Sequence, residues 1–203
     1  MEKIITKELT ENAFTYDEYK DLVNKLVAEN KTSGNNQSEK YIYFTKLNIE
    51  RVKRIEKTTI LSDELKEQLD KISEPLIFLV IAEAWCGDVS QNIPPLKLIS
   101  EYNPNLEVRI IFRDENPEIM DQFLTNGSRS IPVFILLKKD NYDVLGVWGP
   151  RPEPAQQIMI DSKKEPDYSH DEATKKIQLW YAKDRTKTFQ KELADFLKII
   201  SAD

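Results

Sequence analysis

A seven-residue apolar run over 76–82 is the feature that most constrains the fold, because Trp85-Cys86-Gly87-Asp88 follows it after only two residues. Seven residues is strand length. A strand that is apolar on both faces is expected at the centre of a sheet that helices cover on both sides. The segment after Cys86 has helical length. Cys86, the one cysteine of the chain, is therefore predicted at a strand-to-helix junction.

Strands and helices alternate beyond this junction. Further strands are predicted at 106–112, 132–137 and 144–148, and segments of helical length at 89–102 and 116–124. The strand-helix-strand order predicts a parallel half, and the turn before the last strand predicts an antiparallel hairpin. The predicted fold class is therefore α/β, with a mixed sheet flanked by helices.

Helices are predicted before this core, which we place at residues 75–152. In the N-terminal extension, residues 1–74, apolar residues recur at helical spacing over 16–27 and 41–55. A third helix is expected to begin after an N-cap at Ser62. The extension is therefore predicted to be helical throughout its folded parts.

The C-terminal segment, residues 153–203, is also predicted to be helical and to pack on the core. Three prolines within 150–154 cannot continue a central strand, so they mark the end of the sheet. A short helix is expected over 155–160, and an apolar helical stripe follows over 177–200. The stripe is compatible with one helix or with two helices broken near 184–186.

The charge of the chain argues against polyanionic partners. Lys and Arg number 29 against 35 Asp and Glu, a formal net charge of −6, which on average repels nucleic acid and acidic membrane surfaces. The second predicted helix has a basic side, which we interpret as a solvated face because acidic residues lie beside it. The basic residues are Arg51, Lys53 and Arg54, and their acidic neighbours are Glu50 and Glu56.

The scarcity of cysteine and histidine limits the possible chemistry. A single cysteine excludes an internal disulfide and any zinc site that needs two cysteines. The only histidine, His170, is expected to be solvated near a helix start, so neither a metal nor another cofactor is predicted. The N-terminus lacks the pattern of a signal peptide, and the longest apolar run is far short of the ~20 residues of a membrane span, so the cytoplasm is the expected compartment.

Cys86 is the candidate reactive group. The partial positive charge of a helix N-terminus favours a thiolate, whereas Asp88 opposes it, although Asp88 could also cap free backbone amides. We therefore expect a pKa that is lowered but not extreme. The alternative is that Cys86 is a small buried apolar residue, which is the common fate of a lone cysteine.

These motifs together resemble the thioredoxin superfamily, whose members carry Trp-Cys-Gly-Pro-Cys at the same junction. Other resembling features fall in the same order and at similar spacing between Leu76 and Pro152: Pro94, Asp114-Glu115-Asn116-Pro117, Arg129-Ser130-Ile131-Pro132 and Gly149. Within the superfamily the chain is most similar to bacterial thioredoxin-like proteins with Trp-Cys-Gly-Asp, a helical N-terminal extension and a Trp-Gly-Pro-Arg-Pro segment.

The resemblance implies a substrate groove. It implies a cis Ile131-Pro132 bond in a loop that faces Cys86, and a backbone there that binds an extended substrate. Arg129 is expected to offset charge near the sulfur. The residues implied for the groove are Trp85, Gly87, Asp88, Ile131, Pro132 and Arg129, beside Cys86 as the catalytic residue.

Two positions depart from the superfamily pattern. Val89 stands where the resolving cysteine is found, so an internal thiol cannot release a mixed disulfide at Cys86. Val80 stands where the superfamily has a buried acid that moves protons. The full dithiol reductase cycle is therefore not expected.

Three functions remain open. The first is a monothiol thiol-disulfide exchange at Cys86 with a disulfide-containing or thiol substrate, which could be a protein, resolved by an external thiol. The second is a non-catalytic thioredoxin-fold module that binds extended peptides. The third, a glutathione-dependent, glutaredoxin-like role with an iron-sulfur cluster, is disfavoured because Cys-Gly-Asp-Val differs from the Cys-Gly-Phe-Ser of cluster-binding glutaredoxins. The oligomeric state is not predicted.

Overall fold

The computed structural model describes residues 4–200. Within these residues the helices are α1 (Lys7–Asn12), α2 (Tyr16–Ala28), α3 (Glu39–Thr58), α4 (Asp63–Leu69), α5 (Gly87–Asn92), α6 (Pro94–Tyr102), α7 (Pro117–Met120), α8 (Glu153–Ser162), α9 (His170–Asp184) and α10 (Lys187–Ile200). The strands are β1 (Leu76–Ala82), β2 (Leu106–Phe112), β3 (Val133–Lys138) and β4 (Val144–Trp148). No helix among these residues is long and apolar enough to cross a membrane.

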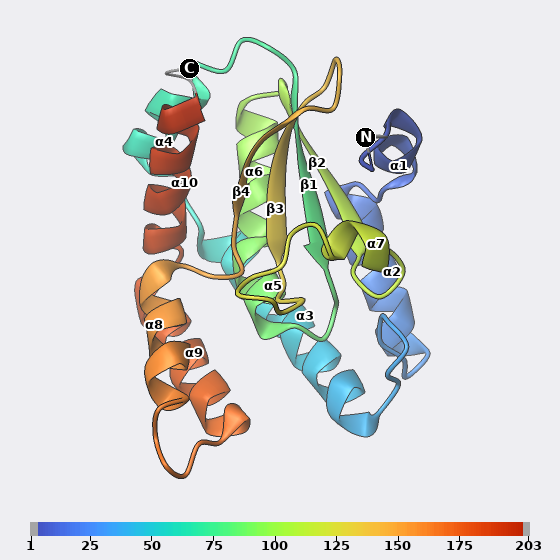
Figure 1. Cartoon of the computed structure of the whole chain (residues 1–203), viewed down its shortest axis with the longest axis vertical. Helices are drawn as coiled ribbons and strands as arrows, with labels where there is room; N and C mark the ends of the chain where they lie inside the picture. Colours follow the sequence, from blue (N-terminus) through green and yellow to red (C-terminus); the bar gives the residue numbers. More distant parts are fainter. Residues whose placement is uncertain (1–3, 201–203) are drawn as a thin grey trace.

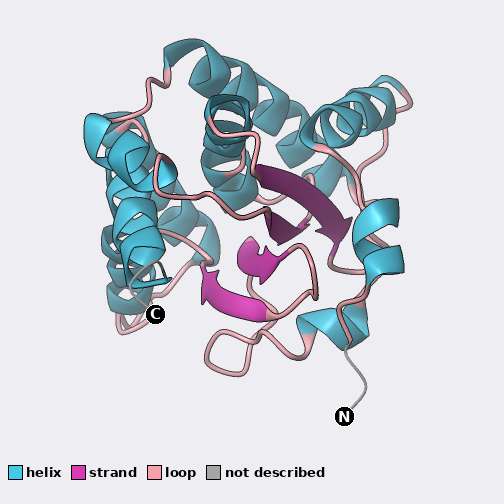
Figure 2. Cartoon of the chain, turned by 90° about the horizontal axis from the view of Figure 1, so that it is seen from above, coloured by secondary structure: helices cyan, strands magenta, loops and turns pink. Residues whose placement is uncertain are grey.

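The strands form one mixed sheet in the order β2-β1-β3-β4. β1 pairs with β2 in parallel and with β3 antiparallel, and β3 pairs with β4 antiparallel. Every residue of β1 is buried, because strands cover both its edges and helices cover both its faces. Figures 1 and 2 show the strands lying among the helices. The predicted α/β class with a mixed sheet is confirmed.

The N-terminal helices share the core of the sheet. Tyr19 and Val23 of α2 and Leu65 and Leu69 of α4 belong to the same buried apolar cluster as Phe78 of β1. Their helices begin at side-chain caps, since Thr15 and Glu18 form a capping box and the Ser62 hydroxyl accepts from the Leu65 amide. The extension is thus bound to the sheet by burial of apolar surface.

The C-terminal stripe is two helices, the second of the two possibilities that the sequence left open. α9 ends at Asp184, its C-cap Arg185 has the left-handed φ of 54°, and α10 begins at Lys187. α10 packs beside α4 and stacks Phe196 on Phe78, so it belongs to the main core. α8 and α9 form a hairpin with a small apolar cluster of its own, visible at the lower left of Figure 1.

Three local differences separate the structure from the sequence pattern. The predicted helix over 89–102 is divided into α5 and α6 at Ile93, because Pro94 has no amide hydrogen to continue the ladder. The predicted helix over 116–124 is only the four-residue α7, which begins at Pro117. α1 had no predicted counterpart, since its six residues are too few for a clear periodicity.

Replacing Leu65 by alanine should destabilise the whole fold. Its side chain is 0% exposed between α4 and the core, and a Leu→Ala change at such a position costs about 2–5 kcal/mol. Urea unfolding followed by circular dichroism measures the change. Ile60→Ala is the control, because Ile60 is 81% exposed and its truncation should change stability by less than about 0.5 kcal/mol. A two-step transition in which only the extension weakens would contradict a shared core.

Candidate functional site

The loop between β1 and α5 is held by the N-terminal extension. Cys86 is the N-cap of α5 with an extended backbone, φ −77° and ψ 124°. From α3, the buried side-chain amide of Asn48 donates to the carbonyl oxygens of Ala84 at 2.8 Å and of Cys86 at 3.1 Å. Arg51 donates in turn to the Asn48 amide oxygen at 2.7 Å. α3 therefore fixes the backbone that presents the cysteine.

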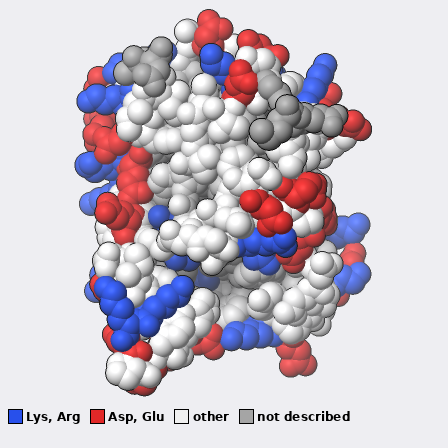
Figure 3. Space-filling view, in the orientation of Figure 1, with Lys and Arg blue, Asp and Glu red and all other residues white. Residues whose placement is uncertain are grey.

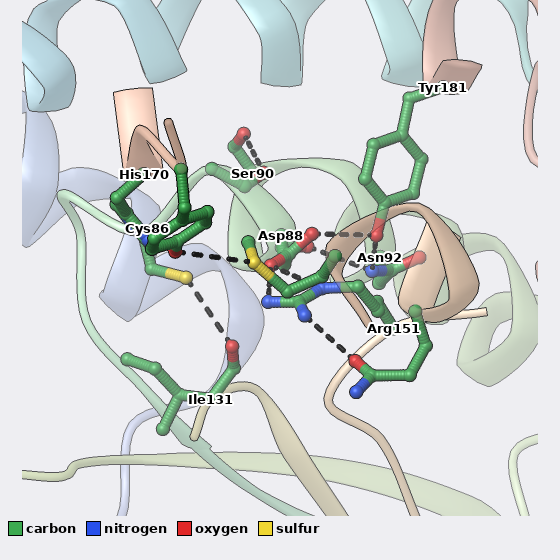
Figure 4. A network of polar contacts seen from close by, with 12 residues as sticks. Cys86, Asp88, Ser90, Asn92, Ile131, Arg151, His170 and Tyr181 are labelled. Carbon is green, nitrogen blue, oxygen red and sulfur yellow. Dashed lines mark hydrogen bonds and ion pairs between the residues drawn. The ribbon is translucent and has the colours of Figure 1, made fainter. Parts of the chain in front are cut away.

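The thiol of Cys86 faces the loop before β3. Its Sγ donates to the carbonyl oxygen of Ile131 across 3.4 Å, and the Ile131-Pro132 bond is cis. Figure 4 shows the sulfur directed toward that carbonyl. The residue is half-buried, and the expected cis bond and its position opposite Cys86 are both found. The geometry brings together Cys86, Ile131 and Pro132 as predicted from the motifs.

The expected lowering of the thiol pKa is wrong. Burial of the sulfur and, to a smaller extent, the charge of Asp88 together raise the pKa of Cys86 from 9.0 to about 12. The backbone amides of Val89 and Asp88 and the charge of Arg151 act in the opposite direction but are weaker. The thiolate loses more stability through lost hydration than the N-terminus of α5 returns to it, so the thiol is protonated at neutral pH.

Asp88 is the centre of a buried polar network (Figure 4). Its carboxylate accepts from Nε and a terminal nitrogen of Arg151 at 2.9 and 2.6 Å, and from the hydroxyl of Tyr181 at 2.9 Å. Asn92 donates to the same hydroxyl at 2.9 Å. The side chains of Asp88 and Arg151 are only 10% and 13% exposed. Asp88 thus anchors the chain after β4 and helix α9.

Arg151 and Tyr181 were missed by the sequence analysis. Arg151 lies between two prolines of the segment that ends the sheet, and this position was the one weak sign in the sequence that it belongs to the site. Tyr181 is 93 residues from Asp88, and its helical pattern predicted only burial. Burial and the charge of Asp88 raise the pKa of Tyr181, which keeps its hydroxyl protonated as a donor.

Trp85 and Gly87 are half-buried against side chains of neighbouring segments. Trp85 stacks on Tyr41 with ring centres 4.5 Å apart, and the guanidinium of Arg113 lies 5.0 Å from its ring. A Cβ at Gly87 would lie 2.8 Å from the Gln178 side-chain nitrogen of α9 and 3.4 Å from a guanidinium nitrogen of Arg51. Only glycine fits this position without a shift of its neighbours.

Arg129 and Gly149 border the cis-proline loop in different ways. Arg129 forms a bidentate ion pair with Asp121 at 2.7 Å and is about half exposed, and no contact joins it to Cys86. The cations that interact with the thiol are Arg151 and Arg51. At Gly149, with φ 132°, a Cβ would lie 2.4 Å from the carbonyl oxygen of Pro132, so the close approach of the two chains requires glycine there.

Glu83 is a buried acid that the sequence analysis did not single out. It follows β1 directly and is fully buried. Its carboxylate accepts from the Ser33 hydroxyl and, at 3.0 Å, from the Asp114 amide. Burial raises its pKa. Val80, at the position of the buried acid in the superfamily, is an apolar residue inside the sheet. Glu83 has a different role, since its hydrogen bond from Ser33 ties the loop before α3 to the end of β1.

The described residues offer no cluster of three or more His, Cys, Asp or Glu side chains that could hold a metal ion. His170, at the start of α9, is exposed and lies 3.0 Å from the Tyr168 hydroxyl through its Nδ1.

The sheet order, the cysteine at the N-cap of α5 and the cis-proline opposite it define a thioredoxin-like fold. The chain belongs to a thioredoxin family, because a family model described as thioredoxin matches residues 34–167. The match begins inside the N-terminal extension and ends after α8. A search of curated proteins finds no match.

Two solved structures are similar to this one over most of their length. A protein of unknown function from Pseudomonas aeruginosa is 18% identical, covers 98% of both chains and has a TM-score of 0.62. An HIV epitope-scaffold is 19% identical, covers 88% of this chain and 94% of its own, and has a TM-score of 0.51. At these identities the likeness concerns the fold alone, and its extent includes the added helices.

Alkylation of Cys86 by iodoacetamide should be slow at pH 7 and should rise about tenfold per pH unit to pH 10, because only the thiolate reacts and the pKa is about 12. The control is Ile60→Cys in a Cys86→Ser background, whose thiol is exposed and should level off near pH 9. Quenched mass spectrometry gives both rates. A Cys86 rate that levels off below pH 9 would show that the thiol is not held protonated.

Proposed function

We propose that this protein binds a disulfide-containing or thiol substrate in the groove beside Ile131 and Pro132, and that Cys86 forms a slow, long-lived mixed disulfide with it. The position of the lone thiol carries this proposal. Cys86 is half-buried and lies 3.4 Å from the Ile131 carbonyl, at the place where an extended substrate would meet the cis-proline loop.

The chemistry is a single exchange. Cys86 loses its proton to solvent, the thiolate attacks one sulfur of the substrate disulfide, that S–S bond breaks, and the departing thiolate takes up a proton. The products are a Cys86 mixed disulfide and a free substrate thiol. The chain has one cysteine, so no internal thiol can complete a second exchange.

The raised thiol pKa determines the rates. With a pKa of about 12, a fraction of only about 10⁻⁵ of the thiol is ionised at pH 7, which slows attack. The same pKa makes the Cys86 thiolate a poor leaving group, so external thiols expel it slowly. Slow formation and slow release suit capture of a partner better than catalytic turnover. We place this chemistry in the cytoplasm, where external thiols are abundant.

A non-catalytic binding module is the second candidate. The protonated, hydrogen-bonded thiol favours this candidate, because a protonated thiol is a poor nucleophile. In a binding module Cys86 would only form part of the groove wall. The groove and the cis-proline backbone would then bind an extended peptide without a covalent bond. The two candidates differ in whether Cys86 ever becomes covalently modified.

Incubation with excess glutathione disulfide should add one glutathione to Cys86 over hours at pH 7, faster at pH 9, and the adduct should persist after the excess is removed. Intact-mass spectrometry measures it, with Cys86→Ser as the unmodified control. A reductase-coupled insulin assay should show no turnover. Absence of any adduct at pH 9 in the folded protein would favour the non-catalytic module.

Replacing Val89 by cysteine should restore a dithiol on the first turn of α5. Residues three apart on a helix lie within disulfide reach, so mild oxidation should join Cys86 to the new thiol, and dithiothreitol should reduce the bond. A thiol count and a monomer mass check the result, and the double variant Cys86→Ser, Val89→Cys is the control. Formation of intermolecular dimers alone would argue against the thioredoxin-like geometry of Cys86.

A further inference from the structure

Two arginines of α3 lie beside the first turn of α5 without a carboxylate partner. Within residues 4–200, neither Arg51 nor Arg54 forms an ion pair. Four other arginines are each paired with a carboxylate: Arg109 with Glu107, Arg113 with Asp114, Arg129 with Asp121 and Arg151 with Asp88. Arg185, the C-cap of α9, has no ion pair within residues 4–200 either, so Arg51 and Arg54 are distinguished by lying together beside α5 and not by the lack of a partner alone.

Both arginines are close to the residues that follow Cys86. A guanidinium nitrogen of Arg51 lies 3.4 Å from the position of a Cβ at Gly87. Arg54 reaches the side-chain oxygen of Gln91 at 3.5 Å, and the Gln91 amide donates to Gln178 of α9 at 2.8 Å. The two cations and two amide side chains thus border the first turns of α5 between α3 and α9.

The neighbouring acids neutralise these cations only in part, because the charge of Asp88 favours the Arg51 cation less strongly than burial and Arg54 oppose it. Asp88, the acid of the first turn of α5, is bound to Arg151 and Tyr181, and Glu50 of α3 is paired with Lys53. Burial lowers the pKa of Arg51, and the like charge of Arg54 lowers it further. A half-buried cation beside a second cation is stabilised by an anion placed between them.

This region is open to solvent, since Arg54 is exposed and Arg51 is half-buried. Figure 3 shows a hollow in the lower half of the face that is drawn, with Lys and Arg side chains at its margin. Arg51 donates one hydrogen bond to Asn48, and a guanidinium has five N–H donors in a planar fork. Arg51 therefore retains donors for a carboxylate, an anion whose geometry this fork matches.

We propose that Arg51 and Arg54 form an anion subsite next to Cys86, and that the preferred substrate is a disulfide or thiol with a carboxylate a few bonds from its sulfur. This inference rests on the proposed function, since it assigns the substrate class of the same site. Gln91 and Gln178 add amide donors at the border of the subsite. The N-terminal extension thereby supplies selectivity that the thioredoxin-like core lacks.

The test compares three small disulfides of similar length and different charge: dithiodipropionate with two carboxylates, bis(hydroxyethyl) disulfide with none, and cystamine with two ammonium groups. The full chain is incubated with each at pH 8.5 and low ionic strength, and intact-mass spectrometry gives the rate of adduct formation at Cys86. The result expected is a ratio of the dithiodipropionate rate to the cystamine rate. This ratio should be about tenfold higher in the native protein than in the double variant that carries both Arg51→Gln and Arg54→Gln.

Ratios between variants cancel the intrinsic reactivities of the disulfides. Arg54→Gln alone, at an exposed position, should lower the ratio in the same direction and tests the subsite even where the double variant folds poorly. Lys46→Gln is the matched control, because it removes the same charge from an exposed position of α3 whose amine binds Asn30. It should leave the ratio unchanged. Raising the salt to about 1 M should reduce the native preference, because the Debye length falls to ~3 Å.

The outcomes distinguish failure of the anion subsite from failure of the proposed mixed-disulfide function. Adducts that form at rates independent of substrate charge, or a ratio that Arg54→Gln leaves unchanged, overturn the anion subsite and leave the mixed-disulfide function standing. Equal slowing of all three disulfides in the arginine variants also overturns it, since that result means a general effect on the thiol. Absence of adducts with every disulfide overturns the proposed function and the subsite with it.

Discussion

The buried carboxylate of Asp88 is the charge on which the arrangement of the site depends. An unpaired carboxylate at such a position would cost several kcal/mol of hydration. Arg151 and Tyr181 compensate that cost, and to reach Asp88 the chain after β4 and helix α9 must both lie against α5. The α8–α9 hairpin has only a small apolar cluster of its own, so this network is a main attachment to the core.

The same charge explains the behaviour of the cysteine. A helix end favours a thiolate, but the Cys86 sulfur is poorly hydrated and stands two residues from Asp88, so its pKa rises. Arg151 is committed to Asp88 and relieves the thiol only in part. A dithiol enzyme needs an attacking thiol with a pKa near neutral, whereas a thiol that forms a persistent bond does not. The absence of a second cysteine at position 89, where Val89 stands, is consistent with that electrostatic setting.

The sequence predicted the parts of the fold that depend on local patterns. β1 is an uninterrupted apolar run, α4 begins after the expected N-cap Ser62, and Ile131-Pro132 follows a recognisable motif. The thiol pKa could not be predicted, because it is the difference between two opposing effects whose sizes depend on burial. Tyr181 could not be linked to Asp88, because only the folded chain brings together residues 93 positions apart.

The basic side of α3 shows why charge patterns along one helix are ambiguous. Lys53 is exposed and paired with Glu50, as expected of a solvated face, whereas Arg51 is half-buried against Gly87. Both side chains belong to the same run of mixed charges, and the position of α5 makes one half-buried and leaves the other exposed. Because α3 also fixes the Cys86 backbone through Asn48, one helix of the extension both presents the thiol and places cations beside it. The extension is therefore part of the site, and the thioredoxin-like core alone would retain the cysteine without the support of its loop.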